Sequence, residues 1–213
     1  MAVTSAVVVP SIGDSWAAQA LSAALAAAAA TRGDRVADAV SLAERALRDG
    51  RLLAERGAGA WASAQVLCAL VAIDEHERAL DTCAELTVRA RACGSITGLS
   101  AAVMARGWMA AKRGELAAAE AELRTVLEMY DLASMAIDLG SLLHLLQDAI
   151  LERPSLDDVA ALAETIELEP AFLATFGGAM LLEARGRLRL ARGDLARATE
   201  DLRVAGATYG ALR

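Results

Sequence analysis

Apolar residues recur every three or four positions along most of this chain, with charged residues between them. Near the end of the chain the apolar members of this pattern are Leu195, Ala198, Leu202 and Ala205. The charged residues of the same segment fall on the other side of a helix with about 3.6 residues per turn. The pattern therefore predicts α-helices that each bury one face, and breaks at glycine, proline or aspartate predict the turns between them.

The same order of residues returns 79 positions later. Arg106-Gly107-x6-Gly114-Glu115-Leu116-x2-Ala119-x3-Leu123 aligns with Arg185-Gly186-x6-Gly193-Asp194-Leu195-x2-Ala198-x3-Leu202. Half of this offset is close to 40, and further copies at that spacing have their turns at Gly33-Asp34, Asp74-Glu75-His76 and Pro154-Ser155-Leu156. Gly140 takes the first-glycine position of the copy that turns at Pro154. A fixed period of roughly 40 residues predicts a helical-repeat protein.

The repeat unit is a pair of helices joined by a short turn. Its first glycine lets the two helices approach closely, and its turn glycine permits the backbone conformation that ends one helix and allows the next. Glu115 or Asp194 then lies in the first turn of the following helix, where a carboxylate complements the helix dipole. The expected helices span residues 15–31 and 36–48, 59–73 and 76–92, 97–113 and 116–130, 134–152 and 155–168, and 173–192 and 195–208.

The predicted fold class is all-α, a right-handed α-solenoid of about five helix-turn-helix repeats with a period of about 40 residues. The solenoid covers residues 15–213, and residues 1–14 form an N-terminal extension or cap. Val7-Val8-Val9 lacks a positively charged segment before it, so the extension does not make a signal peptide. Residues 15–31 are free of charge, but they are mostly alanine and slightly short for a bilayer, which favours a buried helix.

Composition agrees with this fold and excludes other classes. Hydrophobic residues make up 56% of the 213 residues, but aromatic residues only 3%, and roughly a quarter of the chain is alanine. Small, helix-favouring residues argue against a β-sandwich or barrel, and the high hydrophobicity argues against disorder. The net charge of −7 argues against a basic nucleic-acid-binding surface over the whole chain.

Candidate catalytic and metal-binding residues are few. Cys68, Cys83 and Cys93 include no Cys-x-x-Cys pair, which suits a reducing compartment and argues against a disulfide or zinc framework. The two histidines, His76 and His144, belong to no catalytic or metal-binding motif. We therefore expect a cytoplasmic protein without catalytic residues, metal or cofactor.

The Gly-x6-Gly-Asp/Glu-Leu-x2-Ala-x3-Leu spacing resembles the tetratricopeptide repeat, and the longer unit is similar to elongated relatives of that repeat. Two runs also resemble the helical-repeat region of the large ATP-binding regulators of the LuxR family. They are Gly107-Trp108-Met109-Ala110-Ala111-Lys112-Arg113-Gly114-Glu115-Leu116-Ala117 and Leu182-Glu183-Ala184-Arg185-Gly186-Arg187-Leu188-Arg189-Leu190-Ala191-Arg192-Gly193-Asp194. The segment from Glu44 to Gly57 is similar as well, and the resemblance covers nearly everything after Ser15. Regulators of this family place an ATPase module before the repeats and a helix-turn-helix module after them. No Gly-x4-Gly-Lys-Ser/Thr motif occurs here, so the resemblance implies the repeat region alone.

The resemblance also implies a binding groove. In this architecture the first helix of each pair lines the concave surface. The residues at the corresponding positions are Trp61, Cys68, Met104, Trp108, Ile137, His144, Met180 and Arg187. The same count also reaches Ala64, Val71, Ala111, Ser134, Ser141, Glu183 and Leu190. Tryptophan and methionine in an adaptable groove suit a small apolar effector or the apolar face of a partner helix. The alternative is that these side chains fill contacts between helices, as large apolar residues at helical spacing usually do.

Charge is uneven near the end of the chain. Residues 154–183 contain six acidic residues and no basic ones, whereas residues 184–213 contain seven arginines and three acidic residues. One interpretation is a surface that docks an acidic neighbour or orients the protein beside a DNA-binding module. The other is a solvated face with ion pairs inside the domain.

The expected function is that of a non-catalytic regulatory or interaction domain of a LuxR-family transcriptional activator, such as one that controls antibiotic biosynthesis. Binding of an effector or protein partner, or self-association as a homodimer, would change the curvature of the solenoid and thereby the assembly of flanking ATPase and helix-turn-helix modules. We expect no direct contact of this piece with nucleic acid or membrane. The alternative is a freestanding scaffold or adaptor protein.

Overall fold

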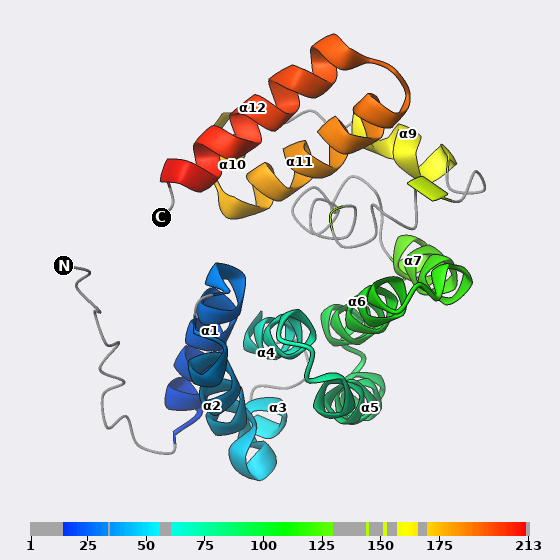
Figure 1. Cartoon of the computed structure of the whole chain (residues 1–213). Helices are drawn as coiled ribbons and strands as arrows, with labels where there is room; N and C mark the ends of the chain where they lie inside the picture. The colour runs from blue at the N-terminus through cyan, green and yellow to red at the C-terminus, as the bar shows by residue number, and fades with distance from the viewer. Residues whose placement is uncertain are drawn as a thin grey trace, which may run out of the picture. The chain divides into compact units, whose positions relative to one another are not determined.

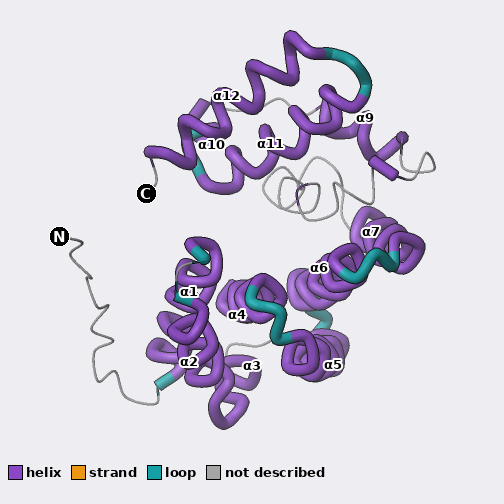
Figure 2. The backbone as a smooth tube through the Cα atoms, viewed as in Figure 1, coloured by secondary structure: helices purple, strands orange, loops and turns teal. Residues whose placement is uncertain are grey.

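The computed structural model describes residues 15–33, 35–55, 61–129, 144, 151–152, 157–165 and 170–211. Within these ranges the regular elements are all helices and no strand occurs, which confirms the all-α prediction (Figure 1, Figure 2). None of the helices in this part of the chain combines the length and the apolar character that crossing a bilayer requires.

Most of the long helices follow one another in pairs. The pairs are α1 (Trp16–Arg32) with α2 (Val36–Leu47), α4 (Trp61–Ala72) with α5 (His76–Cys93), α6 (Ile96–Lys112) with α7 (Leu116–Met129), and α11 (Phe176–Ala191) with α12 (Leu195–Ala211). Helix α9 (Asp157–Thr165) precedes α11. Each begins and ends within a few residues of a predicted helix. The predicted helix 134–152 lies almost wholly outside the described residues, and the arrangement of the pairs as a solenoid stays a prediction.

The turn inside each of these pairs has the same left-handed backbone. The residue at the turn is Gly33 (φ 71°), Asp74 (φ 63°), Gly114 (φ 75°) or Gly193 (φ 80°). Glycine adopts this conformation at no steric cost, and aspartate is among the few other residues that tolerate it. In three of the four turns, the amide of the next residue donates to the carbonyl five positions earlier. These bonds are Glu75 to Leu70, Glu115 to Ala110 and Asp194 to Arg189, each 2.9 Å from nitrogen to oxygen.

Two short helices differ from the prediction. After α2 the chain passes through a 3₁₀ turn, η1 (Arg48–Gly50), into α3 (Arg51–Glu55), because Asp49 and Gly50 both have positive φ. Before α11 lies α10 (Pro170–Leu173). The hydroxyl of Thr175 donates to the Phe172 carbonyl at 2.6 Å and accepts from the Gly178 amide at 3.1 Å. Thr175 therefore caps α11, which begins three residues later than expected.

The chain divides into two compact units, Met1–Ala102 and Val103–Arg213, with the boundary inside α6. In the first unit α1 packs against α2, α3 and α4, and α4 also packs against α5. Ala39 of α2 and Ala79 of α5 are 40 positions apart and both fully buried, so small residues lie where the helices come close. The large buried side chains of this unit are Leu52, Leu53, Leu67, Leu70 and Leu86.

In the second unit α11 packs against α9, α10 and α12. A methyl group on Gly186 of α11 would lie 2.8 Å from Cγ of Leu202 on α12, which confirms that the first glycine of the repeat permits a close approach. Asp194 lies one position before α12 rather than in its first turn, and its Oδ1 accepts from the Arg197 amide at 3.2 Å. Asp194 is therefore the N-cap of α12, because the short side chain of the residue just before a helix can accept from the backbone amides of its first turn.

Candidate binding surface

Helix α4 turns two of the predicted groove residues to the surface. Trp61 is 62% exposed and Cys68 is also exposed. The opposite face of α4 carries Val66, Leu67 and Leu70, which are buried in the first unit. Val71 is buried as well, so its assignment to the groove is wrong. Val71 lies one position before Ala72, the half-buried residue that follows Cys68 by four positions on the side of Trp61.

The surroundings of Cys68 do not favour the nucleophilic thiolate form of its side chain. Neighbouring protein atoms disfavour the charged thiolate and raise the pKa of the thiol. The group is therefore a neutral thiol near pH 7, and a neutral thiol is a poor nucleophile. Its chemistry here is that of a small apolar side chain on an open helix face.

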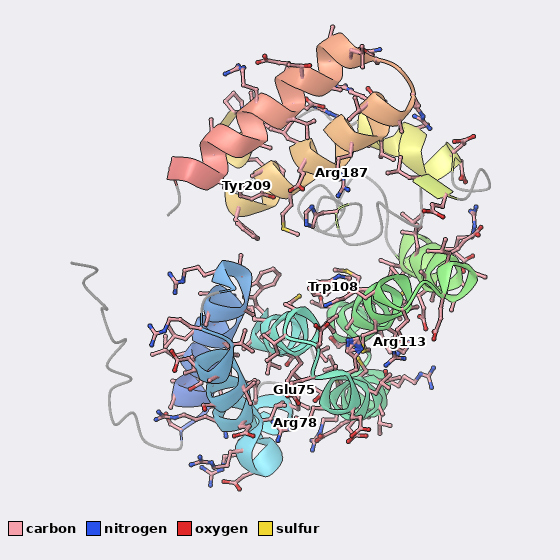
Figure 3. All side chains as sticks on the ribbon, viewed as in Figure 1. Glu75, Arg78, Trp108, Arg113, Arg187 and Tyr209 are labelled. Atoms are coloured by element: carbon pink, nitrogen blue, oxygen red, sulfur yellow. The ribbon has the colours of Figure 1, made fainter. Side chains whose placement is uncertain are left out.

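In the second unit, α6 carries Met104 and Trp108, both half-buried. Met104 packs against the apolar core of that unit, which favours the packing interpretation for this residue. Trp108, which is labelled in Figure 3, has a different neighbour, because the ammonium of Lys112 lies 5.7 Å from the centre of its ring. The contact places a positive charge over the ring of this half-buried side chain.

Helix α11 presents four predicted positions on one stripe. Met180 and Glu183 are half-buried, whereas Leu190 and Arg187 are exposed, and Arg187 is labelled in Figure 3. Between them, Leu181, Leu182, Ala184 and Leu188 are buried in the second unit. The stripe thus separates from the core face of the helix as the repeat phase predicts, and its role in binding stays a prediction.

Glu183 also gathers residues from other segments. Its Oε2 accepts a hydrogen bond from the Tyr209 hydroxyl of α12 at 3.0 Å, and Nδ1 of His144 lies 3.6 Å from the same oxygen. Burial raises the pKa of the Tyr209 phenol above its ordinary value, and the Glu183 carboxylate adds to the rise. Phe176 meets Tyr209 edge to face, with ring centres 5.6 Å apart. The result is a mixed aromatic and charged surface.

Tyr209 and Phe176 were not predicted as site residues. Phe176 lies four positions before Met180, so continuing the stripe by one turn would have found it. Tyr209 is 26 residues away from Glu183 and on the second helix of its pair, where the repeat phase gives no signal.

Within the second unit, acidic residues of the segment 154–183 form ion pairs with arginines, most of them from the segment 184–213. Glu164 accepts two hydrogen bonds from Arg189, at 2.9 and 2.6 Å, and Arg197 lies 3.8 Å away. Asp157 and Asp158 lie 3.4 Å from Arg192 and Arg124. The hydrogen bonds from Arg189 lower the pKa of Glu164. These contacts favour internal pairing over a surface that docks an acidic neighbour.

In two of the helix pairs, an ion pair joins the first helix to the second. Arg185 makes two hydrogen bonds to the buried Asp201, at 2.8 and 2.9 Å. Each of these residues is 16 positions from its partner, and the same spacing separates Arg106 from Glu122. Arg106 makes two hydrogen bonds to Glu122, at 2.8 and 3.0 Å. The two arginines are 79 positions apart, as are the two carboxylates, so the repeat includes a bidentate ion pair that spacing of glycines alone did not reveal.

Among the described residues, no group of three histidine, cysteine, aspartate or glutamate side chains is arranged to hold a metal ion. Ser134, Ile137 and Ser141 lie outside the described residues. Comparison of the chain with protein-family models, with curated proteins and with solved structures finds no match.

Proposed function

We propose that this chain is a non-catalytic binding module in which open helix faces recognise an apolar partner, that of α4 in the first unit and, separately, those of α6 and α11 in the second. The partner is a small effector or the apolar face of another helix. Both suit surfaces that combine tryptophan and methionine with scattered charges.

The observation that carries this proposal is the placement of the aromatic residues. Of the six that the structure describes, none is fully buried: Trp16, Trp108, Phe172 and Tyr209 are half-buried, and Trp61 and Phe176 are exposed. The described core consists instead of alanine, leucine and valine with Cys83 and Met109. Aromatic residues contribute most at binding surfaces, so the open rings of Trp61 and Phe176 suit the chain to binding.

The resemblance of residues 107–117 and 182–194 to the repeat region of LuxR-family regulators supports a regulatory role for this module, in an activator of a specialised metabolic pathway. A freestanding scaffold or adaptor is the second candidate, because helical repeats serve many roles. Reading the gene on both sides of the segment separates the two. An ATPase and a helix-turn-helix encoded in the same frame support the regulator, and their absence supports the scaffold.

Site-specific photo-cross-linking tests the binding surface. A benzophenone amino acid replaces Trp61 in one variant and, as a control, Val88 in another, because Val88 is equally open to solvent but lies on α5. We expect a discrete adduct from position 61 in cells of the source organism and none from position 88. Adducts of equal yield at both positions, or none at position 61, contradict the proposal.

Two further measurements separate the kinds of partner. A small effector changes the emission of Trp61 or Trp108 and raises the melting temperature, since binding to the folded state stabilises it. A second copy of the chain instead gives a dimer in light scattering, and a monomer at high concentration removes that version.

A further inference from the structure

A cavity of about 200 Å³ lies between α1 and α2 in the first unit, and its lining includes no residue of α4, α6 or α11. Leu25 and Ala29 of α1 and Leu42 of α2 form its apolar wall. Ala29 and Leu42 are buried and Leu25 is half-buried, so this wall is part of the packed core of the helix pair. The cavity is therefore shaped by fixed elements rather than by surface side chains alone.

The rim of the cavity is basic. Arg32, Arg35 and Arg45 line it, against a single lining carboxylate, that of Asp38. Arg35 pairs with Asp38, but a guanidinium has five N–H donors and can hold this partner and a second anion together. The Ser41 hydroxyl donates to the Ala37 carbonyl at 3.0 Å, so a ligand is held by the arginines, whose five N–H donors each serve their present partners and an anion together. In a chain of net charge −7, this lining attracts an anion.

The size of the cavity limits the ligand. An apolar cavity of about 150 Å³ accommodates benzene, so one of this size has room for an aromatic ring with one small substituent. The substituent that the rim recognises is a carboxylate, because a planar guanidinium pairs with it through two parallel hydrogen bonds.

We infer that the α1–α2 cavity binds a small apolar carboxylate, with the ring or branched chain against Leu25, Ala29 and Leu42 and the carboxylate at the arginine rim. This site does not depend on the proposed binding surface. Either one can fail while the other stands.

Benzoate and benzamide are matched probes, because they share the ring and differ in charge. Each is titrated into the full chain to about 10 mM, a range that detects millimolar affinity, and binding is followed by amide chemical shifts. We expect benzoate to shift the amides of Leu25, Ala29 and Leu42 and to bind at least tenfold more tightly than benzamide. Raising sodium chloride to about 0.5 M weakens benzoate binding and leaves benzamide unchanged.

Two variants test the rim. Arg45→Gln weakens benzoate binding about fivefold, whereas Arg91→Gln, an exposed arginine of the same unit outside the cavity, leaves it unchanged. Ser41→Glu adds a carboxylate to the lining at an exposed position and abolishes binding while the chain keeps its helical circular dichroism. Equal affinity for benzoate and benzamide, shifts confined to other helices, or no shifts overturn the inference.

Discussion

Asp201 is a buried carboxylate on which two arginines depend. Its side chain is 7% exposed, those of Arg185 and Arg189 are 13% and 12% exposed, and both arginines donate to it at 2.7 to 2.9 Å. Arg189 also bonds to Glu164, so one guanidinium connects α9 with α12. Removing the carboxylate leaves two poorly solvated positive charges close together.

We therefore expect Asp201→Ala to lower the free energy of unfolding by about 3 kcal/mol, measured by urea denaturation. The control is Glu200→Ala on the neighbouring position of the same helix. Glu200 pairs with Arg203 in full contact with water, and its loss produces no measurable change. Equal effects of the two variants contradict a structural role for the buried pair.

Gly186 gives a second prediction for a single residue. An added methyl group meets Cγ of Leu202 at 2.8 Å and Cβ of Asp201 at 3.2 Å, so Gly186→Ala forces the two helices apart and destabilises the protein by about 1–3 kcal/mol. Gly206 lies inside α12, and apart from that helix's own backbone and the adjacent residues no atom lies within 4 Å of the added methyl group. Gly206→Ala should therefore stabilise by about 0.5–1 kcal/mol, because alanine favours the helix. Thermal unfolding of both variants tests the opposite signs.

The turns between paired helices are the elements that the repeat spacing describes best. The count of 40 positions back from Gly114 reaches Asp74, and the structure gives both residues a left-handed backbone. Because an L-residue is strained there, Gly114→Ala should cost about 1 kcal/mol. Asp74→Gly should gain roughly 0.5 kcal/mol, since it relieves strain but adds freedom to the unfolded chain. A loss of stability in Asp74→Gly as large as that in Gly114→Ala contradicts this account.

The sequence predicted the long described helices because each has a periodic apolar face and a turn signal at its end. It did not predict α3 or α10, since helices of five and four residues are too short to show a period. The open stripes of α4 and α11 followed from the repeat phase. The contact between Tyr209 and Glu183 did not, because it depends on the reach of two side chains from different helices.

At the scale of the whole molecule, the two units hold their helices together differently. In the second unit the paired helices are linked by Arg106 with Glu122 and by Arg185 with Asp201. The positions 40 and 80 residues before Arg106 and Glu122 are buried without such a pair. Val66 and Thr82 stand 40 residues before Arg106 and Glu122, and Ala26 and Leu42 stand 80 residues before them. Packing in the first unit is therefore less dependent on charge.

This difference predicts that acid loosens the second unit first. Glu164 has a pKa below its ordinary value of 4.5, so the stability that it provides is complete above pH 4.5 and is lost as the pH falls through its lowered pKa. Two single-tryptophan variants follow the units, one that keeps Trp16 for the first unit and one that keeps Trp108 for the second. In each variant the other two tryptophans are replaced by phenylalanine.

We expect the emission of Trp108 to change at a higher pH than that of Trp16 when the protein is titrated downward from neutrality. Glu164→Gln serves as the control: it lowers the stability of the second unit at neutral pH and makes that stability less dependent on pH below 4.5, because the titrating group is gone. Transitions of Trp16 and Trp108 at the same pH, or an earlier change at Trp16, would show that the ion pairs do not set the acid stability of the second unit.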